Sequence, residues 1–90
     1  MPSVQFTSAL KRFYPHLKQM YVYAGNVKEV LSIIETTYPN ITDYLIDEHG
    51  TLRHHINIFV DGKMIVDREN LTDTLTQNDE VLIFQALSGG

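Results

Sequence analysis

The fold is decided by one helix-forming stretch, residues 26–38, which reads NVKEVLSIIETTY. Asn26 is a good N-cap, and Glu29, three residues later, is placed to reach back to the Asn26 amide in a capping box. Pro39 disfavours helical geometry at the residue before it, so the helix should end at Tyr38. The apolar residues between these limits share one face, at Val27, Val30, Leu31 and Ile34, with Tyr38 extending the stripe. A helix with a single apolar stripe needs a second layer, such as one face of a sheet, to cover it.

Alternating side chains before the helix predict two strands. Val4, Phe6 and Ser8 alternate with polar residues, which indicates a first strand over residues 3–9. Residues 19–24 alternate in the same way and form a second strand that ends at Gly25. The intervening residues 11–17 include a proline and read as a loop, so the two strands should pair as an antiparallel hairpin.

Two further strands are predicted after the helix. Residues 56–60 alternate as INIFV, and Asp61-Gly62 is the turn dipeptide that hairpins favour. Residues 64–66 can then return as a short fourth strand. Between the main helix and this hairpin, residues 41–46 have the pattern of a short helical turn.

The last part of the chain predicts a surface crossing and a final strand. Residues 68–79 are polar apart from Leu71 and Leu75, which should point inward. Residues 80–87 then form the final strand, and the polar tail Ser88-Gly89-Gly90 follows. We therefore expect one domain over residues 1–87 and a flexible tail over residues 88–90, because 90 residues hold a single core.

This order of elements predicts the α+β class. The economical solution is a mixed sheet of four to five strands packed on one main helix, with the final strand beside the first. That arrangement is the β-grasp, or ubiquitin-like, fold.

Composition excludes several classes of function. The net charge is −4 and the seven Lys and Arg residues are scattered along the sequence, so we expect no nucleic-acid partner. The absence of cysteine excludes disulfides, thiolate metal sites and cysteine nucleophiles within this sequence. The apolar runs are far shorter than a membrane span, and residues 1–11 lack the apolar stretch of a signal peptide. We therefore expect a cytoplasmic protein without a membrane partner.

Three other groups of residues are discounted as sites. His54 and His55 should point to opposite faces if they lie in a strand, which disfavours a metal site. The stretch Asp47-Glu48-His49 is typical of a solvated turn rather than of a catalytic acid–base pair. The remaining candidates are aromatic residues that could stack on a base but more often pack or lie at the sheet surface, namely Tyr14, Tyr21 and Tyr23.

Several sequence features together resemble the MoaD/ThiS-like ubiquitin-like sulfur carriers. They are the order of elements, the strand and turn at residues 56–62, the entry Asn78-Asp79-Glu80-Val81 to the last strand, and the terminal Gly89-Gly90. Residues 52–62 are especially similar to carriers of the CysO type, from a bacterial route of cysteine synthesis. Two departures leave the subfamily open: the loop at residues 11–17 is long and aromatic, and Ala86-Leu87-Ser88 precedes the glycine pair.

The resemblance implies that the chemistry takes place on Gly90. An E1-like adenylating enzyme of the MoeB/ThiF type would use ATP to adenylate this carboxylate, and a sulfur nucleophile, often a persulfide, would convert it to a thiocarboxylate. A downstream sulfur-accepting enzyme of cysteine, thiamine, molybdopterin or siderophore synthesis would then take the sulfur. The chain would be a carrier rather than an enzyme, would bind no cofactor of its own, and would be monomeric when free. Ser88 and Gly89 would complete the tail, because glycine threads a narrow channel easily.

The partner-binding surface is expected on the outer face of the sheet. If Val81 and Ile83 point at the helix, Leu82 and Phe84 point the other way, and the same alternation places Phe59 with them. Together with Leu87, these large apolar residues would form an exposed patch of the kind that marks an interface.

Three alternatives share the fold. The protein could be a modifier joined through Gly90 to lysines of other proteins, the small subunit of a molybdopterin synthase, or an interaction module whose glycines have no chemical role. Mass spectrometry separates these, because a thiocarboxylate, an isopeptide conjugate and a stable larger complex have different masses.

Overall fold

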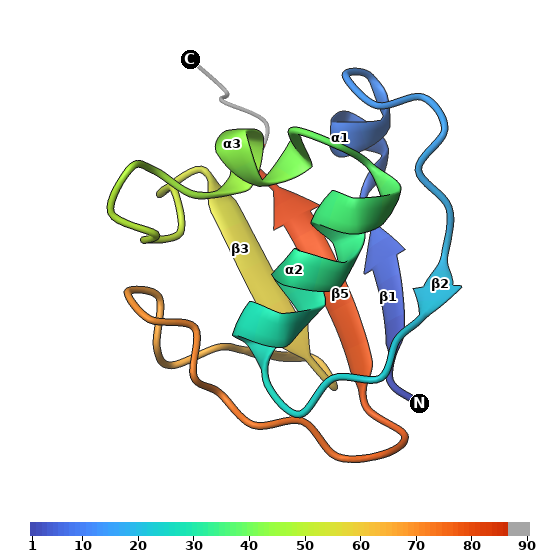
Figure 1. Cartoon of the computed structure of the whole chain (residues 1–90), viewed down its shortest axis with the longest axis vertical. Helices are drawn as coiled ribbons and strands as arrows, with labels where there is room; N and C mark the ends of the chain where they lie inside the picture. Colours follow the sequence, from blue (N-terminus) through green and yellow to red (C-terminus); the bar gives the residue numbers. More distant parts are fainter. Residues whose placement is uncertain (87–90) are drawn as a thin grey trace.

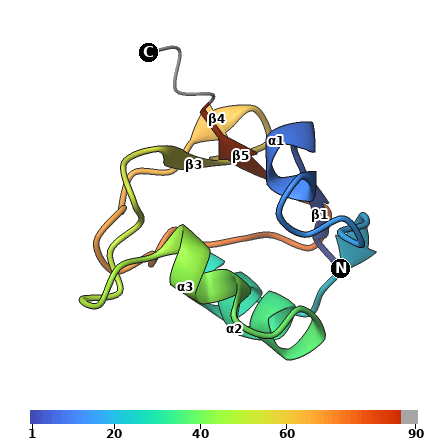
Figure 2. The ribbon, with the colours of Figure 1, turned by 90° about the horizontal axis from the view of Figure 1, so that it is seen from above.

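The computed structural model, whose described residues are 1–86, has a mixed sheet with two helices, α2 (Val27–Thr37) and α3 (Ile41–Leu45), on one of its faces (Figures 1 and 2). The sheet order is β2-β1-β5-β3-β4, in which β1 and β5 are parallel and the other neighbours are antiparallel. The strands are β1 (Ser3–Phe6), β2 (Met20–Tyr21), β3 (Ile56–Val60), β4 (Lys63–Met64) and β5 (Glu80–Gln85). The final strand thus lies beside the first, and the predicted β-grasp fold is confirmed.

The main helix, α2 (Val27–Thr37), forms as its sequence predicts. The side-chain oxygen of Asn26 accepts a hydrogen bond from the Glu29 amide at 2.9 Å. The return bond of the capping box differs from the prediction, because the Glu29 carboxylate accepts from the amide of Gly25 rather than that of Asn26. The helix ends at Thr37, with Tyr38 as its C-cap before Pro39. Its apolar stripe is buried against the sheet, as expected.

The first strand is shorter than predicted, because residues 8–11 form a helical turn, α1 (Ser8–Lys11). Ala9 and Leu10 are both buried, and Leu10 is 0% exposed. Consecutive residues of a strand point to opposite faces, whereas a helical turn can direct both of these side chains into the core. The prediction of a strand over residues 3–9 was therefore wrong after Phe6.

The observed bounds of the second and fourth strands also differ from the predicted ones. The second strand is confined to Met20–Tyr21 instead of residues 19–24, although the Val22 amide still donates to the Pro2 carbonyl at 2.9 Å. The return strand β4 is Lys63–Met64 rather than residues 64–66. The turn before it is as predicted, since Asp61 and Gly62 both have positive φ, 52° and 83°, as the favoured hairpin turn requires.

A short helix, α3 (Ile41–Leu45), confirms the helical turn expected there. Farther along, Leu71 is buried and Leu75 is half-buried against the core, as predicted. The strand β5 ends at Gln85, earlier than the predicted residue 87. Leu87 itself lies outside the described residues. No helix among residues 1–86 is both long and apolar enough to cross a membrane.

Arg68 ties the crossing loop to the start of β3. Its guanidinium donates to the Asn57 side-chain oxygen at 2.8 Å and to the carbonyls of Arg53 and Ile56 at 2.8 and 2.9 Å. A charge-assisted hydrogen bond is stronger than a neutral one, so these contacts fix the turn before β3 against the loop after β4.

Candidate functional site

The strand β5 carries the chain to the end of the sheet where the C-terminal residues begin (Figure 1). There the Ala86 amide donates to the His55 carbonyl at 2.8 Å, and the Tyr44 hydroxyl donates to the Gln85 side-chain oxygen at 2.8 Å. These two hydrogen bonds therefore hold the chain against the domain as far as Ala86. Leu87, expected in the final strand, and the expected tail of Ser88, Gly89 and Gly90 lie outside the described residues, and their roles stay predictions.

The two faces of β5 differ as the alternation predicts. Val81 and Ile83 are buried on the helix side, while Leu82 and Phe84 are half-buried on the opposite side. Phe59 of β3 pairs in register with Leu82, and its ring meets that of Phe84 edge-on with centroids 6.0 Å apart. The predicted orientation of these three apolar side chains is confirmed. Their role in partner binding stays a prediction.

The outer face of the sheet has a shallow hollow of about 430 Å³. Its apolar walls come from Phe59, Leu82 and Phe84, with Gln5 and Glu80 on its polar edge. Met64 pairs with Phe59 across β3 and β4 and is exposed, so it extends the apolar surface toward the edge of the sheet. The hollow offers apolar contact area and one carboxylate, which suits recognition of another surface more than catalysis.

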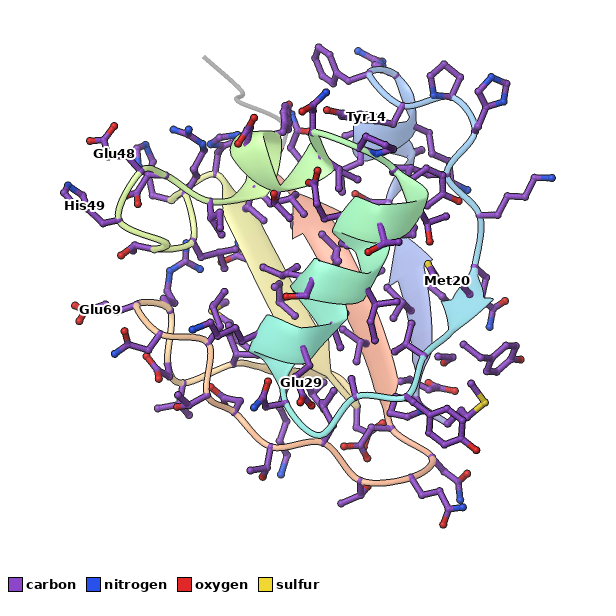
Figure 3. The ribbon with its side chains drawn as sticks, in the orientation of Figure 1. Tyr14, Met20, Glu29, Glu48, His49 and Glu69 are labelled. Atoms are coloured by element: carbon purple, nitrogen blue, oxygen red, sulfur yellow. The ribbon has the colours of Figure 1, made fainter. Side chains whose placement is uncertain are left out.

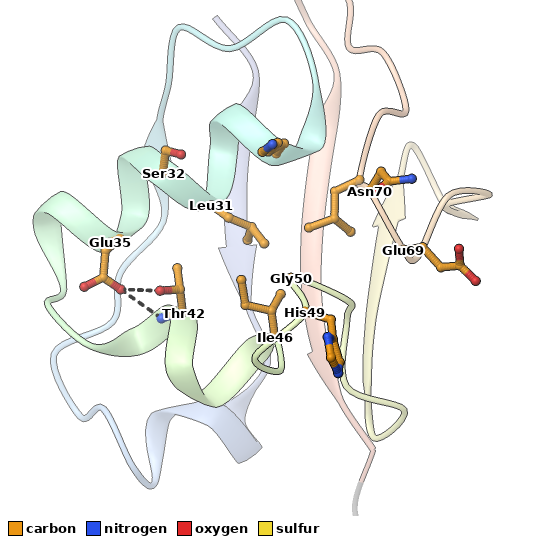
Figure 4. A pocket seen from close by; sticks show the side chains of 11 residues that line it. Leu31, Ser32, Glu35, Thr42, Ile46, His49, Gly50, Glu69 and Asn70 are labelled. Carbon is orange, nitrogen blue, oxygen red and sulfur yellow. Dashed lines mark hydrogen bonds between the residues drawn. The ribbon is translucent and has the colours of Figure 1, made fainter.

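A second groove, of about 380 Å³, lies on the helix side of the molecule (Figure 4). Its apolar part is formed by Leu31 and Ile46 together with Leu71. The Glu35 carboxylate at its rim accepts hydrogen bonds from the Asn40 amide, the Thr42 amide and the Thr42 hydroxyl. These bonds, that from Asn40 first, lower the pKa of Glu35. Glu35 therefore joins α2 to α3 and is a poor candidate for proton transfer.

The discounted residues occupy turns or the surface. His54 and His55 lie in the turn before β3, with ring centroids 6.2 Å apart. They are not in a strand, so the expectation that their side chains point to opposite faces does not apply. Among residues 1–86, no three side chains of metal-binding type gather into a cluster. Glu48 and His49 point away from the domain (Figure 3). The Thr51 and His49 amides bond to the Asp47 carboxylate and lower its pKa, which confirms the expected turn.

The tyrosines do not act together as a stacking platform. Tyr14 is half-buried beside α1 and donates its hydroxyl to the Asn40 carbonyl at 3.2 Å (Figure 3). Tyr21 and Tyr23 instead lie exposed at the β2 edge, on a different part of the surface.

One cluster near the end of β5 was not predicted. The ring of Tyr44 contacts those of Phe13, Tyr14 and His55, with centroids 5.2, 6.4 and 5.8 Å away. These residues come from three separate segments of the chain. The signal in the sequence was the unusually aromatic loop at residues 11–17.

Comparison of the sequence with known families identifies the group to which this domain belongs. The sequence model of the ThiS family matches residues 16–90, which is most of the chain and includes the glycine pair. The chain belongs to the ThiS family.

Relatives of this ThiS-family protein are small proteins of similar length. It is 28% identical over 66 residues to small archaeal modifier protein 3 of Haloferax volcanii, covering 73% of this chain and 71% of that one. A chain of the Amycolatopsis orientalis BexX/CysO complex superposes with a TM-score of 0.84 at 20% identity, with 100% of both chains covered. Mycobacterium tuberculosis CysO gives 0.81 at 22% identity, covering 97% of this chain and 100% of the other.

Family membership and fold agree on the general class. The ThiS-family match and the modifier relative place the protein among small ubiquitin-like carriers and modifiers, and the solved structures show the shared β-grasp fold.

Proposed function

We propose that this ThiS-family protein is a sulfur carrier, that Gly90 is its C-terminal residue, and that the Gly90 carboxylate is converted to a thiocarboxylate. The observation that carries the proposal is the family match, which extends through Gly89-Gly90. It is supported by a β-grasp domain whose last strand ends at Gln85, a few residues before that pair in the sequence.

Activation is needed because a carboxylate is a poor electrophile at neutral pH. A Gly90 oxygen would attack the α-phosphorus of ATP in a partner of the MoeB/ThiF type, and pyrophosphate would leave. Bisulfide would then attack the carbonyl carbon of the acyl-adenylate, and AMP would leave with its electron pair. If a persulfide attacks instead, a thiol must afterwards reduce the acyl disulfide. Two easier displacements thereby replace one difficult one.

The sequence suits this chemistry in two ways. Glycine lacks a Cβ, so Gly89 and Gly90 can enter a narrow channel and adopt backbone angles closed to other residues. The sequence has no cysteine, so no thiol of its own competes for the activated acyl group. The protein needs no cofactor, because ATP is bound and consumed by the partner.

The outer face of the sheet is the proposed docking surface for the activating enzyme. Phe59, Leu82 and Phe84 offer an apolar hollow on the one sheet face that α2 leaves open (Figure 2). Leu87 would continue this surface toward the tail. A downstream enzyme that accepts the sulfur would meet the same end of the domain.

Intact-mass spectrometry tests the proposal. The protein is incubated with its own organism's activating enzyme, ATP and sulfide, and we expect pyrophosphate release and a species in which one oxygen is replaced by sulfur. Deletion of Gly90 should abolish both signals, while Ser88→Ala, a matched change inside the tail, should keep them. Pyrophosphate release without any sulfur-containing species, with sulfide present, would contradict the carrier function.

A second candidate, a protein modifier, is favoured by the relative named small archaeal modifier protein 3. Here the same acyl-adenylate would react with a lysine Nζ of another protein, AMP would leave, and an isopeptide bond would form. Peptides in which Gly90 is joined to lysine, recovered from the native host and absent from the Gly90 deletion strain, would identify this outcome.

A further inference from the structure

An aromatic and basic surface surrounds the point at which β5 ends. We call it the tail-root surface and define it as Lys11, Arg12, Phe13, Tyr44, Arg53, His54 and His55. Its members come from α1, α3 and the turn before β3, which meet at one end of the molecule (Figure 1). The ring contacts run in series from Phe13 through Tyr44 and His55 to His54.

The tail-root surface is tied rigidly to the strand that leads into the tail. The Tyr44 hydroxyl bonds to the Gln85 side chain, and the His55 carbonyl accepts from the Ala86 amide. Arg53 fixes the same group of elements, because its guanidinium donates twice to the Asp43 carbonyl, at 3.2 and 3.1 Å. A partner that grips this surface therefore also fixes the direction in which β5 delivers the chain.

The charge on this surface is opposite to that of the protein as a whole. The net charge is −4, yet Lys11, Arg12 and Arg53 lie at this end. The carboxylates beside them are those of Asp43 on α3 and of Asp47, which interacts with Arg53. The acidic groups near the turns at the other end of the sheet include Asp61, Asp79 and Glu80. The tail-root surface thus carries more cations than the carboxylates of Asp43 and Asp47 beside it can neutralise.

Phe13 adds an exposed apolar ring to this basic surface. Its side chain is 60% exposed although its ring packs on Tyr44, and no described residue covers the outward side of the ring enough to bury it. An exposed aromatic ring flanked by cations is typical of a contact site rather than of a solvated loop.

The short tail brings any enzyme that acts on Gly90 close to this end of the domain. Gly90 is four residues beyond Ala86, and an extended chain spans at most about 3.5 Å per residue, so the reacting atoms of any enzyme must come within roughly 14 Å of Ala86. The mouth of the channel that receives the tail would then come close to the residues around Ala86, which include the tail-root surface.

We propose that the tail-root surface is a second docking surface, for an acidic rim around the tail channel of the enzyme that activates Gly90. This inference rests on the proposed function. Opposite charge on the rim would steer the tail toward the channel and orient it, which acts mainly on the rate of association. The aromatic centre would supply the apolar contact that follows.

A nucleic acid fits the same surface less well. The cations are few, the Tyr44 hydroxyl is engaged with Gln85, and the domain carries a net negative charge that would repel phosphates. A protein rim needs only a few carboxylates.

Steady-state kinetics of pyrophosphate release by the organism's own activating enzyme tests the proposal, with this protein as the varied substrate. The double variant Lys11→Glu/Arg12→Glu should raise KM about tenfold at low salt with little change in kcat, and added salt should reduce the difference. Phe13→Ala should raise KM by a smaller factor that salt does not change. Thermal melting shows whether each variant is folded.

Lys28→Glu is the matched control, because Lys28 is an exposed cation on α2 outside this surface. Its KM should stay near that of the wild type. Equal KM values for the folded double variant and the wild type would overturn the proposal, and so would an equal rise for Lys28→Glu. A wild-type protein that is not adenylated at all overturns the proposed function and this proposal with it. Binding of a single-stranded RNA that the double variant loses would assign the surface to nucleic acid instead.

Discussion

Asn26 closes the N-terminal end of α2 with one hydrogen bond, from the Glu29 amide to its side-chain oxygen. Replacing it with alanine leaves that amide without its protein acceptor. We expect Asn26→Ala to lower the free energy of unfolding by about 1 kcal/mol, the usual cost of losing such a cap. Urea unfolding followed by circular dichroism measures the change.

Ser32→Ala is the control for this residue, because Ser32 is exposed in the middle of the same helix. Alanine has the higher helix propensity there, so the change should be within about 0.5 kcal/mol of zero or slightly stabilising. Equal losses in the two variants would mean that the Asn26 bond contributes nothing particular to the helix.

Single residues also show where prediction from sequence ends. The cap at Asn26 was visible because its partner lies three residues away, yet the return bond from Glu29 reached Gly25 instead of Asn26. The contacts of Arg68 could not be predicted, since its acceptors lie 11 to 16 residues earlier and three of them are backbone carbonyls, which every residue possesses. Local hydrogen bonds follow from spacing, whereas these depend on how the loops fold back.

At the scale of elements, the two faces of β5 make a direct comparison possible. Ile83 is 0% exposed on the helix side, so Ile83→Ala should lower the free energy of unfolding by about 2–4 kcal/mol. Leu82 is half-buried on the outer face, so Leu82→Ala should cost less, about 1 kcal/mol. Urea unfolding measures both values. Under the proposed function, Leu82→Ala should also raise the KM of the activating enzyme for this protein.

Two results would contradict this comparison. If Leu82→Ala destabilises the fold as much as Ile83→Ala, the outer face is a second core rather than a docking surface. If Leu82→Ala leaves the KM unchanged, the activating enzyme binds elsewhere.

Elements with an unbroken pattern were predicted well, and those with a change of pattern were not. The alternation in β3 and β5 and the stripe of α2 came directly from the spacing of apolar residues. The strand over residues 3–9 failed because Val4, Phe6 and Ser8 continue an alternation that the chain abandons at Ser8. What breaks it is burial of the adjacent pair Ala9-Leu10, which depends on the core around them.

At the scale of the whole molecule, the candidate site joins distant parts of the sequence. Tyr44 and Gln85 are 41 residues apart, and the ring cluster unites three segments. The Lys and Arg residues are scattered along the sequence, yet three of them belong to the end of α1 and the turn before β3, segments that meet where β5 stops (Figure 1). The alternation of the outer face could be predicted because it is local. The tail-root surface could not, since it exists only once the strand order is fixed.

Acid stability is a property of the whole fold that four carboxylates determine together. Hydrogen bonds lower the pKa of Glu35, Asp47, Asp67 and Asp79, chiefly from Asn40, Thr51, Thr72 and Thr76 respectively. A group with a lowered folded pKa contributes its full stability above its unfolded pKa, about 4, and loses it as the pH falls through the lower folded value. The melting temperature should therefore show little loss from these groups between pH 7 and 5 and fall below pH 4.

Asp79→Asn isolates one of these groups. Asp79 is buried beside the start of β5, and its carboxylate accepts from the hydroxyl and the amide of Thr76. We expect the variant to melt below the wild type at pH 7, and the gap to narrow as the pH falls below 4, because the wild type then loses the charge that the variant lacks. Glu69→Gln, at an exposed position of the crossing loop, should follow the wild type throughout. A gap for Asp79→Asn that stays constant down to pH 2.5 would show that its charge adds nothing to the stability of the fold.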